Sequence, residues 1–217
     1  MTTLSSTSLP ESLINHNFQS DRLSCMRGDR MLFTGIGFQL KAGEWLHVRG
    51  ENGVGKTSLL RLLAGLSKPL EGSIDWNGIS IEADPTSYRR ELFFLGHRDA
   101  LKDDLTAFEN VLIASALDGS AVSQDQALSA LCRFGLRGRE LLPVSCLSAG
   151  QKRRVILARL LLRKATLWIL DEPFNALDSR AVELLSNLIA EHLASGGMAV
   201  LTSHQSIPLP NAKVLSL

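Results

Sequence analysis

The sequence predicts an α/β fold, a mostly parallel sheet with helices on its faces. Four short apolar runs have the length and composition of buried strands: residues 45–48, 92–95, 167–170 and 199–202. Apolar residues at helical spacing follow the first and third of these runs, at 58–64 and 179–194. Such alternation is typical of parallel sheets. With 217 residues, 45% of them apolar, the chain can bury the core of one domain with a small insertion.

The N-terminal residues carry the weakest signals. Residues 1–20 are rich in Ser, Thr and Asn without a period, so we expect a loose tail, followed by a single domain over 21–217. Within that domain, residues 21–49 are expected to hold two strands, separated by turns at Gly28, Gly35 and Gly43.

A glycine-rich loop between the first strand and its helix carries the most specific motif: a glycine, four residues, then Gly-Lys-Thr. The glycines permit turns that point successive N–H groups at phosphate oxygens, and the helix adds its positive N-terminal end. Lys56 supplies a charge for the β- and γ-phosphates, and Thr57 supplies a hydroxyl for Mg²⁺. The predicted nucleotide-binding residues of this segment are Gly50, Glu51, Asn52, Gly53, Val54, Gly55, Lys56, Thr57 and Ser58.

The next hundred residues leave the strand–helix pattern. Gly65, with Pro69 soon after, is expected to end the first helix. Residues 72–78 predict a short strand closed by an Asn-Gly turn. From 106 to 134 the apolar residues fall at helical spacing with no strand signal, so we predict an inserted helical lobe over about 98–160.

The strand at 167–170 ends in two acids, Asp171 and Glu172. Alone, these would be two solvated acids in a turn. Beside a phosphate loop, Asp171 is placed to hold Mg²⁺ together with Thr57. Glu172 is then placed to orient or deprotonate an attacking water.

A second segment has the features of a phosphate-binding helix N-terminus but lacks a lysine of its own. A serine hydroxyl and a glycine-flanked turn lead into a helix, in the run Leu147, Ser148, Ala149, Gly150 and Gln151. The alternative is that Ser148 only caps the helix.

These motifs together resemble the nucleotide-binding subunits of ABC transporters over about residues 21–205. Their order and spacing match the Walker A loop at 50–57, the signature motif at 147–151 (with Ala149 where glycine is commoner), Walker B at 167–172, the D-loop at 175–178 and the switch histidine at His204. Two of these residues have simpler alternatives, since Asp178 could be only a helix N-cap and His204 a surface histidine.

The resemblance implies a P-loop NTPase fold of the ABC-cassette type, with a mostly parallel core, an antiparallel β subdomain and an inserted α-helical lobe. It implies an ATPase with ATP and Mg²⁺ as cofactors, Glu172 and His204 as catalytic residues, and Asp178 in the D-loop. It further implies an ATP sandwich dimer, in which residues 147–151 of one cassette act in trans on the nucleotide held by the other.

Two positions depart from the family pattern. Family members carry a glutamine after the strand near residue 95, where this chain has His97; we expect His97 to take that role or to pack at the lobe hinge. An aromatic residue that stacks on adenine is expected near position 27, where this chain has Arg27. An arginine plane can also stack on a base.

The chain resembles one branch of the family, the ATP-binding subunit of the bacterial cytochrome c biogenesis (haem) exporter. The resemblance rests on the short length and on residues 30–33, 95–97 and 171–178. That branch implies multi-span membrane subunits, a second copy of the chain and haem-handling proteins as partners, on the cytoplasmic face of the inner membrane. The alternatives are a subunit of an exporter for lipid or drug, a soluble ABC-type protein of translation or DNA repair, and a small-molecule kinase. Residues 147–151 argue against the kinase.

Composition excludes several other classes. A net charge of +1 gives no reason to expect a nucleic-acid partner. Three widely spaced cysteines (Cys25, Cys132 and Cys146) form no paired motif and indicate a reducing compartment. We expect no secretory signal and no membrane span, because no basic start precedes an apolar run and no apolar stretch reaches the length of a bilayer.

Overall fold

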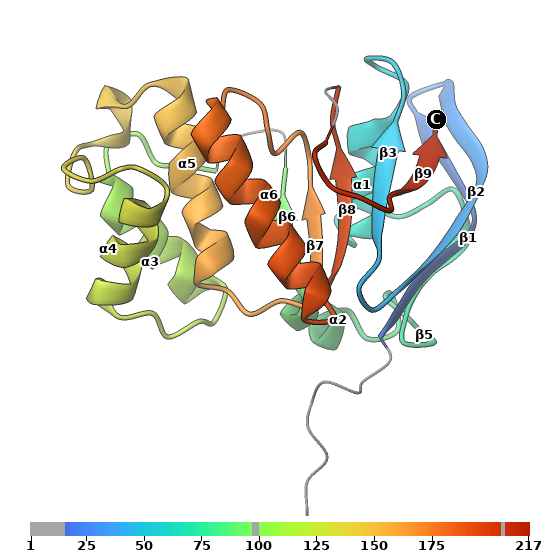
Figure 1. Ribbon diagram of the computed structural model, residues 1–217. Helices are drawn as coiled ribbons and strands as arrows, with labels where there is room; N and C mark the ends of the chain where they lie inside the picture. The colour runs from blue at the N-terminus through green and yellow to red at the C-terminus, as the bar shows by residue number, and fades with distance from the viewer. Residues whose placement is uncertain (1–15, 97–99, 205–206) are drawn as a thin grey trace, which may run out of the picture.

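The computed structural model describes residues 16–96, 100–204 and 207–217, which fold into two sheets and a helical lobe (Figure 1). The lobe helices gather at one end of the parallel sheet, and the antiparallel strands lie at the other end. The predicted combination of a mostly parallel core, an antiparallel β subdomain and an α-helical lobe is therefore confirmed.

The parallel sheet has the strand order β6-β7-β8-β3-β9. Its strands are β3 (Trp45–Arg49), β6 (Leu92–Leu95), β7 (Leu167–Leu170), β8 (Met198–Thr202) and β9 (Lys213–Ser216). Leu170 pairs with Leu95 on one side and Leu201 on the other, and all these strands run the same way. The loops after β3, β7 and β8 therefore all start at the carboxyl ends of the parallel strands. The phosphate loop and the two acids lie at this end of the sheet.

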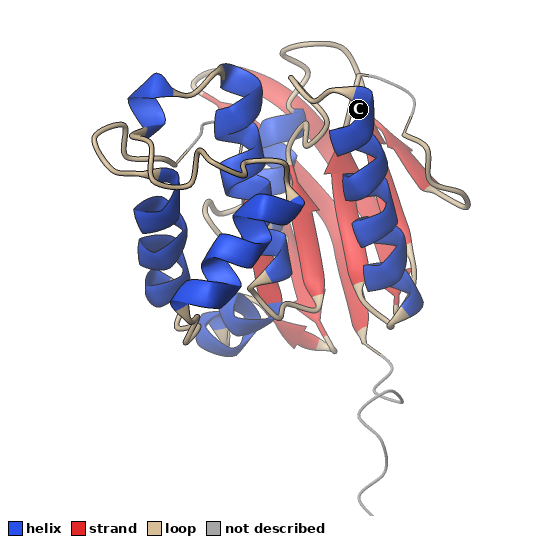
Figure 2. Cartoon of the chain, turned by 60° about the vertical axis from the view of Figure 1, so that its left-hand side comes forward, coloured by secondary structure: helices blue, strands red, loops and turns tan. Residues whose placement is uncertain are grey.

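Helices cover both faces of this sheet, as Figure 2 also shows. The helices of the core are α1 (Lys56–Leu63), α2 (Pro85–Glu91) and α6 (Ser179–Ala194). Leucines of α1 pack on one face with Leu46 and Ile169, while those of α6 pack on the other with Trp45 and Trp168. Because side chains alternate along a strand, one apolar run supplies both faces. This explains why the inner part of the sheet contains unbroken apolar runs such as β6 and β7.

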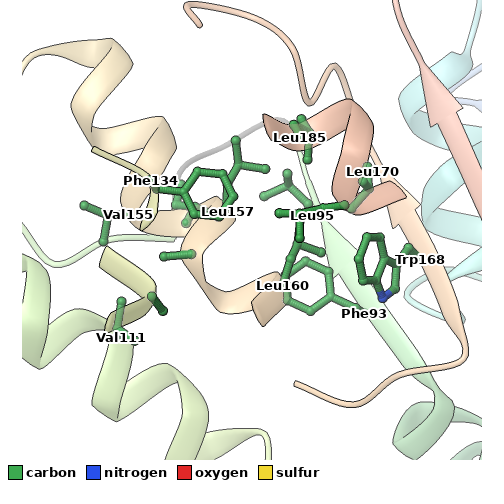
Figure 3. Packing of buried hydrophobic residues seen from close by; sticks show 14 of the residues in the cluster. Phe93, Leu95, Val111, Phe134, Val155, Leu157, Leu160, Trp168, Leu170 and Leu185 are labelled. Atoms are coloured by element: carbon green, nitrogen blue, oxygen red, sulfur yellow. The ribbon is translucent and has the colours of Figure 1, made fainter. Parts of the chain in front are cut away.

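The helical lobe is formed by α3 (Ala107–Leu117), α4 (Gln124–Arg133) and α5 (Ala149–Ala158), with single 3-10 turns at Val144–Cys146 and Arg159–Leu161. Its apolar side chains continue the core of the sheet without a break (Figure 3). Val111, Phe134 and Val155 of the lobe belong to the same buried cluster as Phe93 and Leu170 of the strands. The lobe is therefore held against the sheet by burial of apolar surface.

The antiparallel sheet has the order β2-β1-β4-β5, from β1 (Asn17–Arg27), β2 (Arg30–Lys41), β4 (Glu71–Trp76) and β5 (Ile79–Ser80). The predicted Asn-Gly turn joins β4 to β5, with positive φ at both Asn77 and Gly78. Gly72 approaches the backbone of β1 so closely that a Cβ would lie 2.3 Å from the Asp21 carbonyl oxygen.

Three predictions for the first fifty residues need correction. Strand β1 begins at Asn17, so residues 17–20 do not belong to a loose tail, whereas residues 1–15 lie outside the described residues. Three strands, not two, precede the phosphate loop. Gly35 makes no turn: it lies inside β2, where the β1–β2 pairing shifts register, as at a β-bulge. The start of β1 alternates polar and apolar residues because one side of the strand is exposed, so residues 17–20 could not be told apart from the polar segment before them.

Candidate active site

The phosphate loop has the backbone that its glycines predict. Gly50, Gly53 and Gly55 all adopt positive φ, which residues with side chains rarely do. Helix α1 begins directly after it at Lys56, and Gly55, the N-cap, brings no side chain that could cap the helix. The first-turn N–H groups of α1 therefore depend on an acceptor from outside the loop's own side chains, and phosphate oxygens are suited to that place.

Lys56 is folded back over this loop. Its Nζ donates to the carbonyl oxygens of Gly50 at 2.7 Å and Glu51 at 3.2 Å. The ammonium also lies 3.3 Å from His204 Nε2, although the two residues are 148 positions apart in the chain. Lys56 is 8% exposed, so its charge faces the cleft and the loop rather than bulk water.

Thr57 and Asp171 meet through their side chains, as predicted for a shared metal. The Thr57 hydroxyl donates to Asp171 Oδ2 at 2.7 Å. The other carboxylate oxygen, Oδ1, accepts from the hydroxyl of Thr202 at 2.7 Å. A hydroxyl beside a buried carboxylate is the oxygen donor set that Mg²⁺ takes together with phosphate and water, so these residues fit the ion.

Thr202 was not found by sequence reasoning. It ends β8, is fully buried, and accepts a hydrogen bond from the Glu172 N–H at 2.8 Å while it donates to Asp171. The available signal was that the strand predicted at 199–202 ends in a polar residue, two residues before His204. Thr202 therefore fixes both acids from the neighbouring strand.

Glu172 and His204 face each other across the cleft. His204 Nε2 lies 3.3 Å from Glu172 Oε1, and the His204 N–H donates to Glu172 Oε2 at 3.3 Å. Glu172 has φ 48°, a left-handed conformation that is uncommon for a residue with a side chain. The histidine thus lies between the Lys56 ammonium and the Glu172 carboxylate.

These groups line one cleft of about 210 Å³. Two of the predicted nucleotide-binding residues, Gly50 and Val54, do not line the cleft. The others lie on its wall: Arg27, Glu51, Asn52, Gly53, Gly55, Lys56, Thr57 and Ser58. Leu32 also lines the cleft and was not predicted. An arginine and a leucine together offer a flat and an apolar surface for a base.

The segment 147–151 does not line this cleft. Ser148 is the N-cap of α5, and it exchanges two hydrogen bonds with Gln151: the Gln151 N–H donates to Ser148 Oγ, and the Ser148 N–H donates to the Gln151 side chain. The capping alternative is therefore confirmed as a local role. Ser148 and Ala149 are exposed, so this helix end faces outward.

Helix α5 nevertheless contacts the segment that follows β7. The Arg153 Nη2 donates to the carbonyl oxygens of Asp171 at 2.9 Å and Glu172 at 2.7 Å. The neighbouring Arg154 pairs with Asp178 at 2.6 Å. Sequence reasoning gave neither arginine a role at the site, because only the packing of the lobe on the sheet brings them to this segment.

Asp178 also caps α6 by accepting from the Ala181 N–H at 2.9 Å, which confirms its simpler alternative. That backbone hydrogen bond, together with Arg154, lowers the pKa of the Asp178 carboxyl.

Behind the cleft, burial lowers the pKa of His47 on β3, whose Nε2 lies 3.4 Å from the Ser203 carbonyl oxygen. His97 lies outside the described residues, so its role stays a prediction.

Comparison with known proteins agrees with this geometry. Residues 33–175 match the family model described as ABC transporter. The chain is 50% identical to the cytochrome c biogenesis ATP-binding export protein CcmA of Dechloromonas aromatica, over 92% of this chain and 98% of that protein. It is 43% identical to the protein of the same name in Haemophilus influenzae, over 93% and 95% of the two chains.

Solved structures share the fold. A putative ABC transporter ATP-binding protein from Pyrococcus furiosus superposes with a TM-score of 0.79 at 25% identity, covering 93% of this chain and 97% of that one. The ATP-binding cassette MJ0796, solved as a dimer in a post-hydrolysis state with ADP and Pi, has a TM-score of 0.75 at 24% identity, covering 87% of this chain and 88% of that one.

Proposed function

The chain belongs to the ABC transporter ATP-binding family, and from this premise we propose that it is the ATP-hydrolysing, energy-coupling subunit of an exporter in the biogenesis of c-type cytochromes. The observation that carries the proposal is the meeting of Lys56, the Thr57–Asp171 pair and the Glu172–His204 pair in one cleft. The names and the 50% identity of the relatives point to the cytochrome c branch.

In this proposal the phosphates of ATP lie against the N-terminus of α1. The loop N–H groups and Lys56 hold the β- and γ-phosphates, so Lys56 exchanges its loop carbonyls for phosphate oxygens. Thr57 and Asp171 hold Mg²⁺, which when bound neutralises phosphate charge. Arg27 and Leu32 form the wall for the adenine.

Glu172 is the catalytic base. Its carboxylate lies in a buried position beside the predicted phosphate site, where it orients the attacking water and accepts its proton. His204 touches both Lys56 and Glu172, so it is placed to hold the γ-phosphate side of the cleft and to fix the Glu172 carboxylate.

A second copy of the chain completes the site. Ser148 and Ala149 are exposed and lie outside the cleft, so the signature segment acts on nucleotide held by a partner cassette. ATP then joins the two cassettes, and loss of the γ-phosphate contacts releases them.

The proposal places the chain on the cytoplasmic face of the bacterial inner membrane, bound to multi-span membrane subunits and acting with haem-handling proteins. Within the part of the chain that the structure describes, no helix has the length and apolar character needed to cross a bilayer.

Replacement of Glu172 by Gln tests the proposal. The amide keeps the size of the side chain but cannot accept the proton of water, so the variant should bind Mg-ATP, lose about 100-fold or more in turnover and accumulate as an ATP-bound dimer. The measurements are ATPase rate of the complex with its membrane subunits and the dimer fraction in gel filtration. Undiminished turnover in this variant would show that Glu172 is not the catalytic base.

A further inference from the structure

Arg153 joins helix α5 of the lobe to the end of strand β7 in the sheet. It lies on α5 and is 6% exposed, and its Nη2 donates to the carbonyl oxygens of both Asp171 and Glu172. These are main-chain acceptors, so through these bonds the arginine holds the backbone at the end of β7. A charged donor makes such hydrogen bonds stronger than neutral ones.

The backbone at Glu172 requires support. A left-handed backbone conformation is unfavourable for a residue with a side chain, and Glu172 has φ 48°. The N–H of Glu172 is held by Thr202, on the sheet, and its carbonyl oxygen is held by Arg153, on the lobe. The direction in which the Glu172 side chain leaves the backbone therefore depends on both the sheet and α5.

Helix α5 also carries Ser148, five residues before Arg153, which is about 7.5 Å along the helix axis. Two further contacts tie this helix to the segment after β7. A Cβ at Gly150 would lie 2.6 Å from the Ala176 carbonyl oxygen, and Arg154 pairs with Asp178. A shift of Ser148 thus moves Arg153 with it, because a helix transmits displacement as a rigid element.

We propose that Arg153 is a positioning residue for Glu172, and that it makes the geometry of Glu172 depend on the position of the signature helix in the same chain. The inference rests on the proposed function, in which Ser148 meets the nucleotide held by the partner cassette. When ATP in the partner's cleft contacts Ser148, the position of α5 then sets the Glu172 carboxylate in the chain's own cleft. The link connects the two ATP sites through one guanidinium group.

A double-mutant cycle on the complex with its membrane subunits tests this link. Arg153→Met removes the guanidinium but keeps an apolar stem, and should lower kcat about 10- to 100-fold with a KM for ATP within about threefold. In a Glu172→Gln background, single-turnover hydrolysis should fall by less than about twofold on adding Arg153→Met, because both changes act on the same group. Arg153→Lys keeps the charge but can reach fewer acceptors, so its kcat should lie between those of the wild type and Arg153→Met.

The cooperativity of ATP hydrolysis separates positioning from general stability. The wild-type complex should show a Hill coefficient above one, and Arg153→Met should reduce it to one. Arg163→Met is the matched control: Arg163 is a half-buried arginine beyond α5 that pairs with Asp118 at 2.8 Å, away from the cleft. It should lower the melting temperature and leave kcat and the Hill coefficient unchanged.

Three results would overturn the inference: a wild-type rate in Arg153→Met, an equal loss of kcat in the Arg163 control, or multiplying effects in the double mutant. A wild-type Hill coefficient of one would contradict the link between the two sites. Each is distinct from failure of the proposed function. If Glu172→Gln hydrolyses ATP normally, the base assignment fails whatever Arg153 does. If Glu172→Gln is inactive and Arg153→Met is normal, only the positioning role fails.

Discussion

The N-termini of α1 and α5 carry the two predicted phosphate-contacting motifs, yet the chain prepares them in opposite ways. Helix α1 starts after Gly55, which has no side chain to cap it, and Lys56 and Thr57 lie in its first turn. Helix α5 starts after Ser148, whose hydroxyl and main chain already exchange two hydrogen bonds with Gln151. One helix end is open to an anion, and the other is closed by its own residues.

The difference shows how two similar helix ends can serve different purposes. The open end offers a row of N–H groups and a charge, which suits holding phosphates within one chain. At the closed end, the Ser148 hydroxyl accepts from Gln151 but keeps its own proton for donation. It therefore offers one donor at an exposed position, which suits contact with a nucleotide held by another chain.

The largest expected effect is at the open end. Lys56→Ala removes the charge that faces the phosphates, so ATP binding should weaken by about 10- to 150-fold and turnover should be lost. Binding of a fluorescent ATP analogue and ATPase rate measure this. Lys68→Ala, at an exposed lysine beyond α1, should change neither. If Lys56→Ala bound nucleotide normally, the open helix end would not be the phosphate site.

At the closed end, Ser148→Arg should separate binding from hydrolysis. The bulky side chain blocks the interface with the partner cassette, so hydrolysis by the complex should fall about 100-fold while one chain still binds nucleotide within about twofold. Ser123→Arg is the control, because Ser123 caps α4 with the same pair of hydrogen bonds. It should cost about 1 kcal/mol of stability and spare hydrolysis. Full-rate hydrolysis by a strictly monomeric preparation would contradict the comparison.

A smaller effect is expected at Gly150, in the first turn of α5. Gly150→Ala adds a Cβ that meets the Ala176 carbonyl oxygen, so α5 must move away at a cost of about 1–3 kcal/mol. Turnover should fall about tenfold as Arg153 and Ser148 move with the helix. Ala190→Gly, at an exposed position of α6, should cost about 1 kcal/mol of stability and leave turnover near wild type. Thermal melts and ATPase rates decide the matter, and equal effects of the two variants would refute the packing argument.

The smallest effect is expected at the N-cap of α6. Asp178→Asn keeps the cap but loses the ion pair with Arg154, so the melting temperature near neutral pH should barely change. The lowered pKa of Asp178 means that its contribution is present above the unfolded value and lost as the pH falls through the lowered one. Melts at acid pH should therefore show a slightly steeper loss for wild type than for Asp178→Asn. A steeper loss in the variant would contradict this.

The sequence alone determined the features that are local along the chain. The phosphate loop could be predicted because glycines, a lysine and a helix start stand next to each other, and their chemistry does not depend on distant residues. The strands at 92–95 and 167–170 could be predicted from unbroken apolar runs. Strand β9 could not, because its four residues are largely exposed and gain their hydrogen bonds only beside β3.

Only the tertiary structure decided which distant groups meet. Thr202 touches Asp171 because β8 lies next to β7, and strand order is set by packing across the whole sheet. Arg153 reaches the Glu172 carbonyl because the lobe folds back on the sheet through a shared apolar core. Apolar burial has no direction, so it determines such neighbours only when the complete chain is packed.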